Sequence, residues 1–264
     1  MRTLTKFLIA LAILTAGCAD GDKTAASNSS NDPPQATYIC RRAPTAINID
    51  GKLDDVAWQS ADWTSDFVDV RGKDWPKPRL RTRCKLLYDD QNLYIAADLG
   101  DPDVWGTMTG KDQHLYLENN FEVFLDWQNN ARDYWEFEMN PLNTVWTLQL
   151  DKPLPQGGHP IPGRELIGVK TAVDVQGTLN NTADTDKGWT AEIAIPFATL
   201  AKDGHVPKDG EHWRMLLCRI EWTLFKDTGK YEKVPAGDQY WSWVPTGEIA
   251  YHKPDKYGEL RFER

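Results

Sequence analysis

Apolar and polar residues alternate along most of the chain from about residue 45 onward. In the stretch 121–127, Phe121, Val123 and Leu125 alternate with residues that include Glu122. A period of two is typical of a β-strand with one buried face. The stretch therefore predicts a strand whose second face carries carboxylates.

Short apolar segments of the same kind recur between turn residues. The stretch 80–99 predicts a hairpin that turns at the Asp-Asp-Gln-Asn sequence of 89–92, because polar turn residues separate two apolar runs. Further strands are predicted at 45–51, 134–140, 144–150, 168–175, 188–197, 212–222 and 257–262.

Helical spacing is confined to the segment 52–61 and to a short turn within 198–204. The range 150–168 holds four Pro and four Gly and predicts a long loop, and 225–243 is a second loose stretch. Many short strands with few helices predict an all-β fold, an antiparallel β-sandwich of jelly-roll type with short helical turns.

The N-terminus has the pattern of an export signal. A basic start, an apolar run and a small-residue end predict a signal peptide at 1–17. The sequence "LTAGC" resembles a bacterial lipobox, which makes Cys18 the candidate lipidated residue; the alternative is an ordinary cleaved signal. The range 18–36 then comprises this Cys and a small, polar, flexible tether, and 37–264 is the folded domain.

These features predict the location of the protein. A lipid on Cys18 would tether the chain to a membrane without spanning it. Acidic residues directly after that Cys resemble surface-export signals, so we expect a lipid-anchored protein of the cell envelope, at the outer membrane or cell surface of a diderm bacterium. In such an oxidising compartment Cys40, Cys84 and Cys218 permit one disulfide, whose pairing the sequence leaves open.

Composition narrows the range of functions. The formal net charge is −9, and a protein without a basic face is a poor nucleic-acid binder. Twelve Trp residues are many, and most are expected in the core.

The polar faces of three predicted strands carry the candidate chemistry. If the strands near 119–127, 134–140 and 144–150 pair, one sheet face collects five polar residues. These are Glu122, Glu136, Glu138, Asn140 and Gln149.

This face has three interpretations. It is either a solvated outer face or a sugar site, since carboxylates and amides bind vicinal hydroxyls and aromatic rings cover sugar C–H faces. A glycoside hydrolase would use two such carboxyls about 5–9.5 Å apart. An open sheet face argues against hydrolysis, because no pocket is visible around the carboxylates.

Seven stretches in order then resemble the family 9 carbohydrate-binding modules, in the wider group of DOMON-like β-sandwiches. The resemblance covers roughly 45–263 and implies two packed antiparallel sheets and a non-catalytic module. The stretches are 47–58, 86–105, 118–127, 134–146, 186–197, 213–222 and 251–262.

The resemblance also implies ligand contacts. Two aromatic rings enclose the sugar in the xylanase-borne modules, and their positions fall on Tyr116 and Tyr251. The ligand-reading carboxylate falls on Glu122 and the amide on Asn140. A basic ligand residue of those modules is replaced by Glu138, which puts their sugar specificity and reducing-end preference in question.

Nearby aromatic residues offer further candidate rings. Trp105, Trp241 and Trp243 lie in neighbouring loops and are candidates to replace the family's stacking Trp residues.

The family carries structural calcium, which prefers oxygen ligands. The acidic pairs Asp101 with Asp103, and Asp184 with Asp186, are the loops that could bind it, and no other cofactor is predicted.

Two rival classes stay open. Some DOMON-like relatives bind haem through Met and His, for which Met108 with His114 or Met139 with His252 are the candidate pairs. The anchored protein could instead be a docking subunit of a glycan-processing complex. The favoured prediction is a non-catalytic protein that binds plant or algal polysaccharide or its fragments and supports its breakdown beside a glycan-degrading enzyme.

Overall fold

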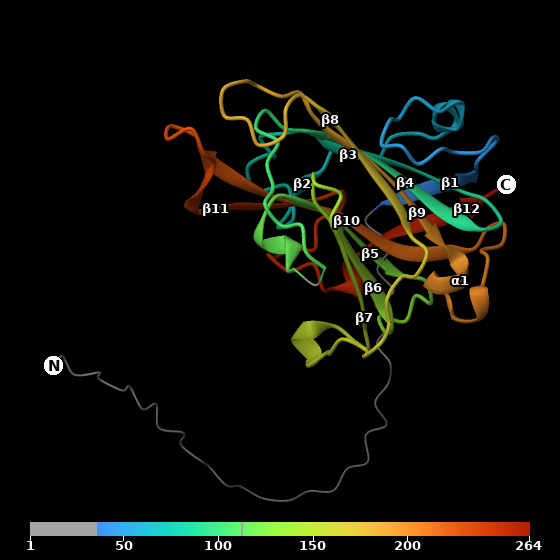
Figure 1. The fold of residues 1–264 in the computed structure, drawn as a ribbon. Helices are drawn as coiled ribbons and strands as arrows, with labels where there is room; N and C mark the ends of the chain where they lie inside the picture. The colour runs from blue at the N-terminus through green and yellow to red at the C-terminus, as the bar shows by residue number, and fades with distance from the viewer. Residues whose placement is uncertain (1–35, 112) are drawn as a thin grey trace, which may run out of the picture. The chain divides into compact units, whose positions relative to one another are not determined.

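The computed structural model describes residues 36–111 and 113–264. Short strands dominate this part of the chain, and its one α-helix is the single turn α1 (Phe197–Leu200) (Figure 1). The strands are β1 (Thr37–Arg42), β2 (Val68–Asp69), β3 (Thr82–Tyr88), β4 (Asn92–Gly100), β5 (Asn120–Asp126), β6 (Tyr134–Met139), β7 (Val145–Leu150), β8 (Lys170–Gln176), β9 (Gly188–Pro196), β10 (His212–Phe225), β11 (Glu232–Ser242) and β12 (Gly258–Glu263). The 3-10 turns are η1 (Val56–Ser60), η2 (Leu115–Leu117), η3 (Leu154–Gln156), η4 (Lys202–Gly204) and η5 (Pro254–Lys256).

One continuous sheet curls to form both layers of the sandwich. Its strand order is β7-β6-β5-β10-β12-β1-β3-β4-β9-β8. The long strand β10 pairs with β5 along one edge, while its other edge pairs first with β12 and then with β11. The predicted all-β sandwich is confirmed.

The sheet is not wholly antiparallel. β1 runs parallel to both of its neighbours, β12 and β3. It fills the seam between the two halves, and every other pairing is antiparallel.

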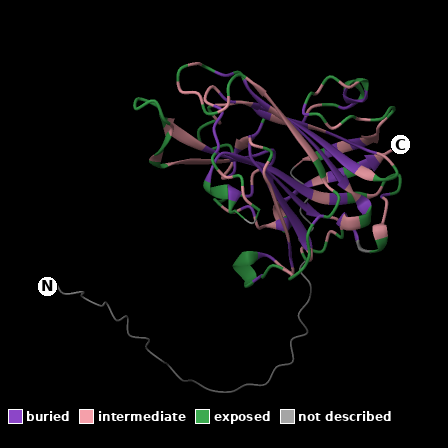
Figure 2. Ribbon diagram, viewed as in Figure 1, coloured by how far each residue is buried: buried purple, intermediate pink, exposed green. Residues whose placement is uncertain are grey.

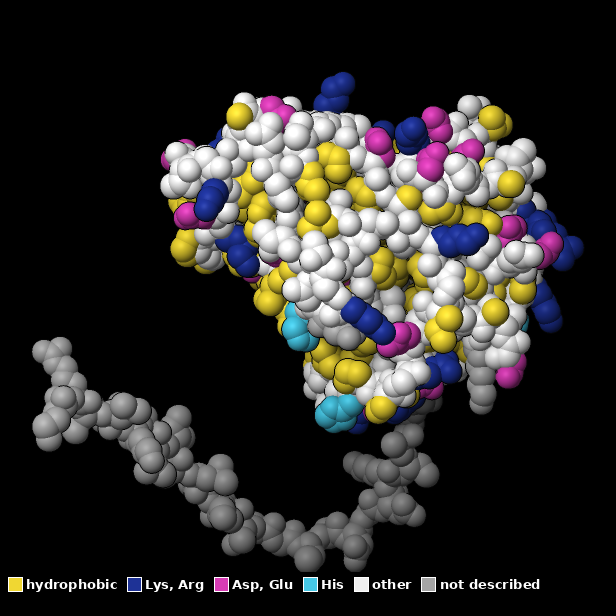
Figure 3. Space-filling model, viewed as in Figure 1, with side chains coloured by type: hydrophobic (Ala, Val, Ile, Leu, Met, Phe, Trp, Pro, Cys, Tyr) yellow, Lys and Arg dark blue, Asp and Glu magenta, His cyan; other side chains and the backbone are white. Residues whose placement is uncertain are grey.

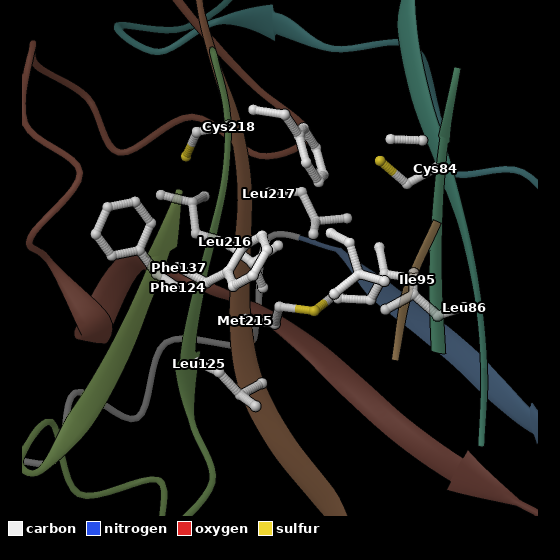
Figure 4. Close-up of a cluster of buried hydrophobic side chains, with 14 of the residues drawn as sticks. Cys84, Leu86, Ile95, Phe124, Leu125, Phe137, Met215, Leu216, Leu217 and Cys218 are labelled. Atoms are coloured by element: carbon white, nitrogen blue, oxygen red, sulfur yellow. The ribbon is translucent and has the colours of Figure 1, made fainter. Parts of the chain in front are cut away.

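Apolar side chains from both halves meet between the layers. Leu86 of β3 and Ile95 of β4 face Met215 and Leu217 of β10, as Figure 4 shows, and all four are fully buried. Most strands are buried along most of their length, whereas β7, β8 and β11 are largely intermediate or exposed (Figure 2). Burial of this apolar surface is the main stabilising contribution to the fold.

The predicted strand at 45–51 is wrong. This segment forms no strand but packs beside η1 in a small second cluster around Trp58. Glu192 of β9 accepts hydrogen bonds from the backbone N–H groups of Asp50 and Gly51 and from Trp58 Nε1, at 2.8–2.9 Å. The alternation of Ile47 and Ile49 therefore reflects packing against this cluster.

The loop predicted at 225–243 is also wrong, because β11 occupies most of it. β11 and the outer half of β10 form a ribbon that is largely solvated, so its residues show no apolar face to detect. The other predicted loop, 150–168, is confirmed and contains the 3-10 turn η3.

Cys40, Cys84 and Cys218 are all buried as free thiols, so the structure forms no disulfide among these three. In the described part of the chain, no helix is long and apolar enough to cross a membrane. The predicted signal peptide at 1–17, Cys18 and most of the tether lie outside the described residues.

Candidate functional site

Two adjacent strands bring three glutamates together on one face of the sheet. Glu122 of β5 lies opposite Glu138 of β6, and Phe124 lies opposite Glu136. Opposed residues of paired strands point to the same face, and so do residues two apart on one strand. One carboxylate oxygen from each glutamate lies within 4.8 Å of the others. We call Glu122, Glu136 and Glu138 the glutamate triad.

The prediction that Gln149 shares this face is wrong. The register of β6 with β7 pairs Glu138 with Trp146 and Trp135 with Gln149. Trp146 therefore lies on the triad's face, and Gln149 points to the other side of the sheet, where Arg164 Nε donates to it at 2.9 Å. The alternation of a single strand does not reveal how a hairpin aligns it with its neighbour.

A cavity of about 480 Å³ lies over the triad. Its floor consists of side chains from β5, β6, β7 and β10. Residues of the loop after β7, among them Leu154 and Pro160, form one wall, and the segment 249–252 forms another. His114 and Tyr116, beside η2, complete the rim.

These walls bury the carboxylates. The exposed fractions are 1% for Glu122, 6% for Glu136 and 0% for Glu138. The interpretation of a solvated outer face is therefore wrong, and the argument against hydrolysis from an open face fails with it. The loops that cover the face follow β7 and β11, and no strand pattern predicts their position.

Hydrogen bonding within the triad is uneven. Asn120 Nδ2 donates to Glu122 Oε1 at 2.8 Å. Glu136 Oε1 lies 3.9 Å from His252 Nε2. Both carboxylate oxygens of Glu138 are buried and have no hydrogen-bond partner in the described part of the chain. Buried carboxylates normally have partners, so Glu138 is the unusual member.

Burial changes the protonation of the triad. It raises the pKa of Glu122 to about 8, with a further contribution from the negative charge of Glu136. It raises the pKa of Glu136 to about 7. Burial, followed by the charges of the other two glutamates, raises the pKa of Glu138 well above its usual range. Burial also lowers the pKa of His252 to about 4, so this ring is neutral at pH 7.

Aromatic rings surround the triad. Trp146 is half-buried and packs against His114, with ring centroids 5.2 Å apart, and against Tyr116, at 6.4 Å. Tyr116 is 42% exposed, which leaves one part of its ring free. Tyr240 and Tyr251 line the opposite side of the cavity, with centroids 6.1 Å apart.

Four of the five predicted binding residues meet in this cavity: Tyr116, Glu122, Glu138 and Tyr251. Tyr251 is largely buried, and its hydroxyl donates to the carbonyl oxygens of Arg219 and Trp241 at 3.0 and 3.2 Å. Its ring is therefore a fixed wall of the cavity, whereas Tyr116 is the exposed ring. Whether these side chains contact a ligand stays a prediction.

Asn140, the fifth, does not line the cavity. Its Nδ2 donates to Met108 O at 2.8 Å, and its Oδ1 accepts from the N–H groups of Leu142 and Thr144. These bonds shape the turn between β6 and β7. A contact of Asn140 with a ligand stays a prediction.

The proposed replacement rings are not available. Trp105, Trp241 and Trp243 are all buried in the protein, where Trp243 Nε1 donates to Met215 O at 3.2 Å. They contribute to the packing of the sandwich and offer no exposed stacking face.

The lining residues without a predicted binding role include Trp146, Glu136 and Tyr240. Glu136 was on the predicted polar face, but the family comparison gave it no role. Trp146 was assigned to the other face. The hairpin turn 140–144 was the one available signal, because its length fixes the register that places Trp146 opposite Glu138.

Three of the four aspartates proposed for calcium have protein partners. Asp101 is buried and accepts from Arg219 at 3.3 Å, and Asp103 accepts from Lys226 Nζ at 2.8 Å. Asp186 accepts from the N–H groups of Val104 and Thr178. Asp184 Oδ1, in contrast, is buried without a hydrogen-bond partner among the described residues, so calcium at these loops stays a prediction. Among the described residues, the glutamate triad is the group with metal-ligand spacing.

The haem pair Met139 with His252 is excluded by geometry. Met139 is opposite Phe121 on the core side of β6, whereas His252 contacts Phe124 on the cavity side. The sheet lies between the two residues, so they cannot hold one iron atom. His114 of the other pair packs against Tyr116 and Trp146.

A β-sandwich with a preformed cavity that is lined by aromatic rings and a few polar groups is typical of ligand-binding β domains. The family model described as "Carbohydrate family 9 binding domain-like" matches residues 49–264. The chain belongs to this family, as the resemblance of its seven stretches predicts.

Two solved structures share the fold. A candidate carbohydrate-binding protein from Bacteroides uniformis matches with a TM-score of 0.63 and 15% identity, over 86% of this chain and 99% of that one. A family 9 carbohydrate binding module from Caldicellulosiruptor kristjanssonii, in complex with cellotriose, matches with a TM-score of 0.56 and 16% identity, over 86% and 93%.

The sequence also matches part of a known enzyme. Exoglucanase XynX of Acetivibrio thermocellus is 25% identical over 152 residues, which are 58% of this chain and 12% of that enzyme. The chain thus spans about an eighth of the length of the relative.

Proposed function

We propose that the cavity binds a carbohydrate and that the protein supports the breakdown of a plant or algal polysaccharide. The observation that carries this proposal is the combination of carboxylates and aromatic rings in one cavity of a family 9 domain. Carboxylates bind pairs of sugar hydroxyls, and the exposed Tyr116 and the half-buried Trp146 can cover the C–H face of a ring. A relative in complex with cellotriose supports a β-linked glucan as the first candidate.

The proposal assigns binding and not hydrolysis to the triad. Its carboxylate oxygens lie within 4.8 Å of one another. The assignment to binding is supported by the family model, which is described as a carbohydrate-binding domain. A separate enzyme then supplies the catalysis. Incubation of the protein with cello- and xylo-oligosaccharides should release no shorter products.

Calorimetric titration with cello- and xylo-oligosaccharides, each native and end-reduced, tests the binding. Binding that is lost on end reduction means that the cavity holds a sugar end, and equal binding means that it holds internal sugars. The absence of heat with every sugar would contradict the proposal for these glycans.

A ring substitution locates the site. Trp146→Ala should weaken binding by about tenfold, because a half-buried ring beside the ligand loses its stacking surface. Trp75→Ala is the matched control, since Trp75 is 48% exposed and packs on Arg71, outside the cavity. Equal affinities of the two variants would place the sugar elsewhere.

We further propose that Cys18 is lipidated and anchors the exported domain at the surface of the cell envelope. The lipobox-like sequence and the polar range that follows it support this. Labelled fatty acid should be incorporated into the parent chain and not into the Cys18→Ala variant. Labelling of both chains, or of neither, would contradict the anchor.

A further inference from the structure

The negative charge of the triad has no partner in the cavity. Among residues 36–111 and 113–264, neither Lys nor Arg lines the cavity. The nearest basic group is the His252 ring, 3.9 Å from Glu136. Buried carboxylates at such short separation need a compensating positive charge, whether from protons or from a bound cation.

The surroundings of Glu138 favour a bound cation as the compensating charge. Its side chain is fully buried, it lines the cavity, and neither carboxylate oxygen accepts a hydrogen bond from the described residues. Glu122 opposite it does accept one, from Asn120. The Tyr116 N–H is close enough to lower the pKa of Glu138 but forms no hydrogen bond of normal geometry with it, so both oxygens remain available for a ligand.

The spacing of the triad matches the coordination shell of a hard cation. Two oxygens on opposite sides of a cation at about 2.4 Å are about 4.8 Å apart, and adjacent oxygens are closer. The three oxygens lie within 4.8 Å of one another, so small side-chain adjustments are enough to bring them around one ion. Three carboxylates without nitrogen or sulfur donors favour Ca²⁺, Mg²⁺ or Mn²⁺.

We propose that Glu122, Glu136 and Glu138 bind one divalent cation of this oxygen-preferring class at the floor of the cavity. Three protein ligands leave coordination positions directed into the cavity. The second part of the inference, which rests on the proposed function, is that vicinal sugar hydroxyls occupy these coordination positions. The cation then fills the role of the basic ligand residue that Glu138 replaces.

The metal is tested without any sugar. The full-length protein, freed of metal by a chelator and dialysed, is titrated by calorimetry with CaCl₂, MgCl₂ and MnCl₂ in turn. At least one of them should bind with a stoichiometry of one per chain. No binding of any of the three at millimolar concentration would overturn the proposal and leave protons as the compensating charge.

Two variants locate the cation. Glu138→Gln keeps the shape of the side chain and should weaken metal binding at least about tenfold. Asp103→Asn is the control in an acidic loop outside the cavity and should bind as the parent does. Unchanged binding by the Glu138→Gln variant, or its loss in the Asp103→Asn variant, would overturn the assignment. Thermal unfolding of the Glu138→Gln variant at the parent temperature or above verifies that it is folded.

The sugar arm separates the two proposals. Sugar binding should be strong with the cation present and at least about tenfold weaker with chelator. Equal sugar binding in both conditions would overturn the bridging role while leaving the proposed function intact. Metal binding without any sugar binding would contradict the proposed function for the tested glycans and leave the metal site standing.

Discussion

Removal of the guanidinium of Arg219 should be the most costly single charge deletion in the sandwich. Arg219 lies on the core side of β10 and is fully buried. It donates five hydrogen bonds, at 2.7–3.3 Å, to two carboxylates, one hydroxyl and one carbonyl oxygen. The acceptors are Glu221, Asp101, Thr82 and Gly100.

The cost follows from what remains after the substitution. Arg219→Met preserves much of the apolar volume but leaves Asp101 and Glu221 buried, and only Arg79, at 2.7 Å from Glu221, still compensates them. Breaking a buried ion pair by removing one partner costs about 3–5 kcal/mol of unfolding free energy. For a domain of this size, that is a decrease of about 6–20 °C in Tm.

Urea unfolding, followed by tryptophan fluorescence and circular dichroism, measures this loss. Arg41→Met is the control, because Arg41 pairs with Asp62 in solvent and such pairs contribute about 1 kcal/mol or less. Asp101→Asn added to Arg219→Met should recover part of the loss. If Arg219→Met costs no more than Arg41→Met, the network does not stabilise the fold as argued.

Three further predictions concern other parts of the fold. Glu192→Ala should cost about 3 kcal/mol in urea unfolding, because three N–H donors, two of them buried, lose their acceptor. A loss below about 1 kcal/mol would contradict this. Gly51→Ala should destabilise the protein more than Gly210→Ala in thermal unfolding. Both glycines have a positive φ, but of the two only Gly51 would place a Cβ 2.6 Å from backbone atoms. Equal losses of Tm would refute the clash. Burial tends to raise the pKa of Glu211, but hydrogen bonds to its carboxylate lower this pKa overall. The ionised carboxylate therefore stabilises the fold above the unfolded pKa of about 4.3. This stabilisation is lost as the pH falls through the folded pKa. Unfolding free energies of the parent and Glu211→Gln should therefore differ most near pH 7 and converge in acid, and a constant difference would contradict the assignment.

The sequence predicted strands correctly where apolar–polar alternation and turn residues agree. The hairpin of β3 and β4 follows from two apolar runs around 89–92, and the structure confirms it. β11 was not predicted because a solvated ribbon has no apolar face. The predicted strand at 45–51 was wrong because alternation also occurs in segments that pack against a core without pairing. Periodicity reports burial, and it reports pairing only indirectly.

The candidate site could not be predicted from local patterns alone, because it is formed by segments that are far apart in the sequence. Glu122 and Glu138 were found because their positions match the family pattern. Their burial depends on loops distant in sequence, among them the segment 249–252. The place of Trp146 depended on the register of one hairpin, where a shift by one residue moves every side chain to the opposite face.

The parallel pairing of β1 with β12 constrains the order in which the domain can assemble. Thr37 is beside Glu259, so one of the first strands to be synthesised acquires this neighbour only when one of the last emerges. Until then, β1 and the beginning of β10 present unpaired strand edges. We expect refolding to be slow for this reason, because contacts of such high sequence separation must form before the sandwich closes. A growing chain should remain sensitive to protease until β12 is available.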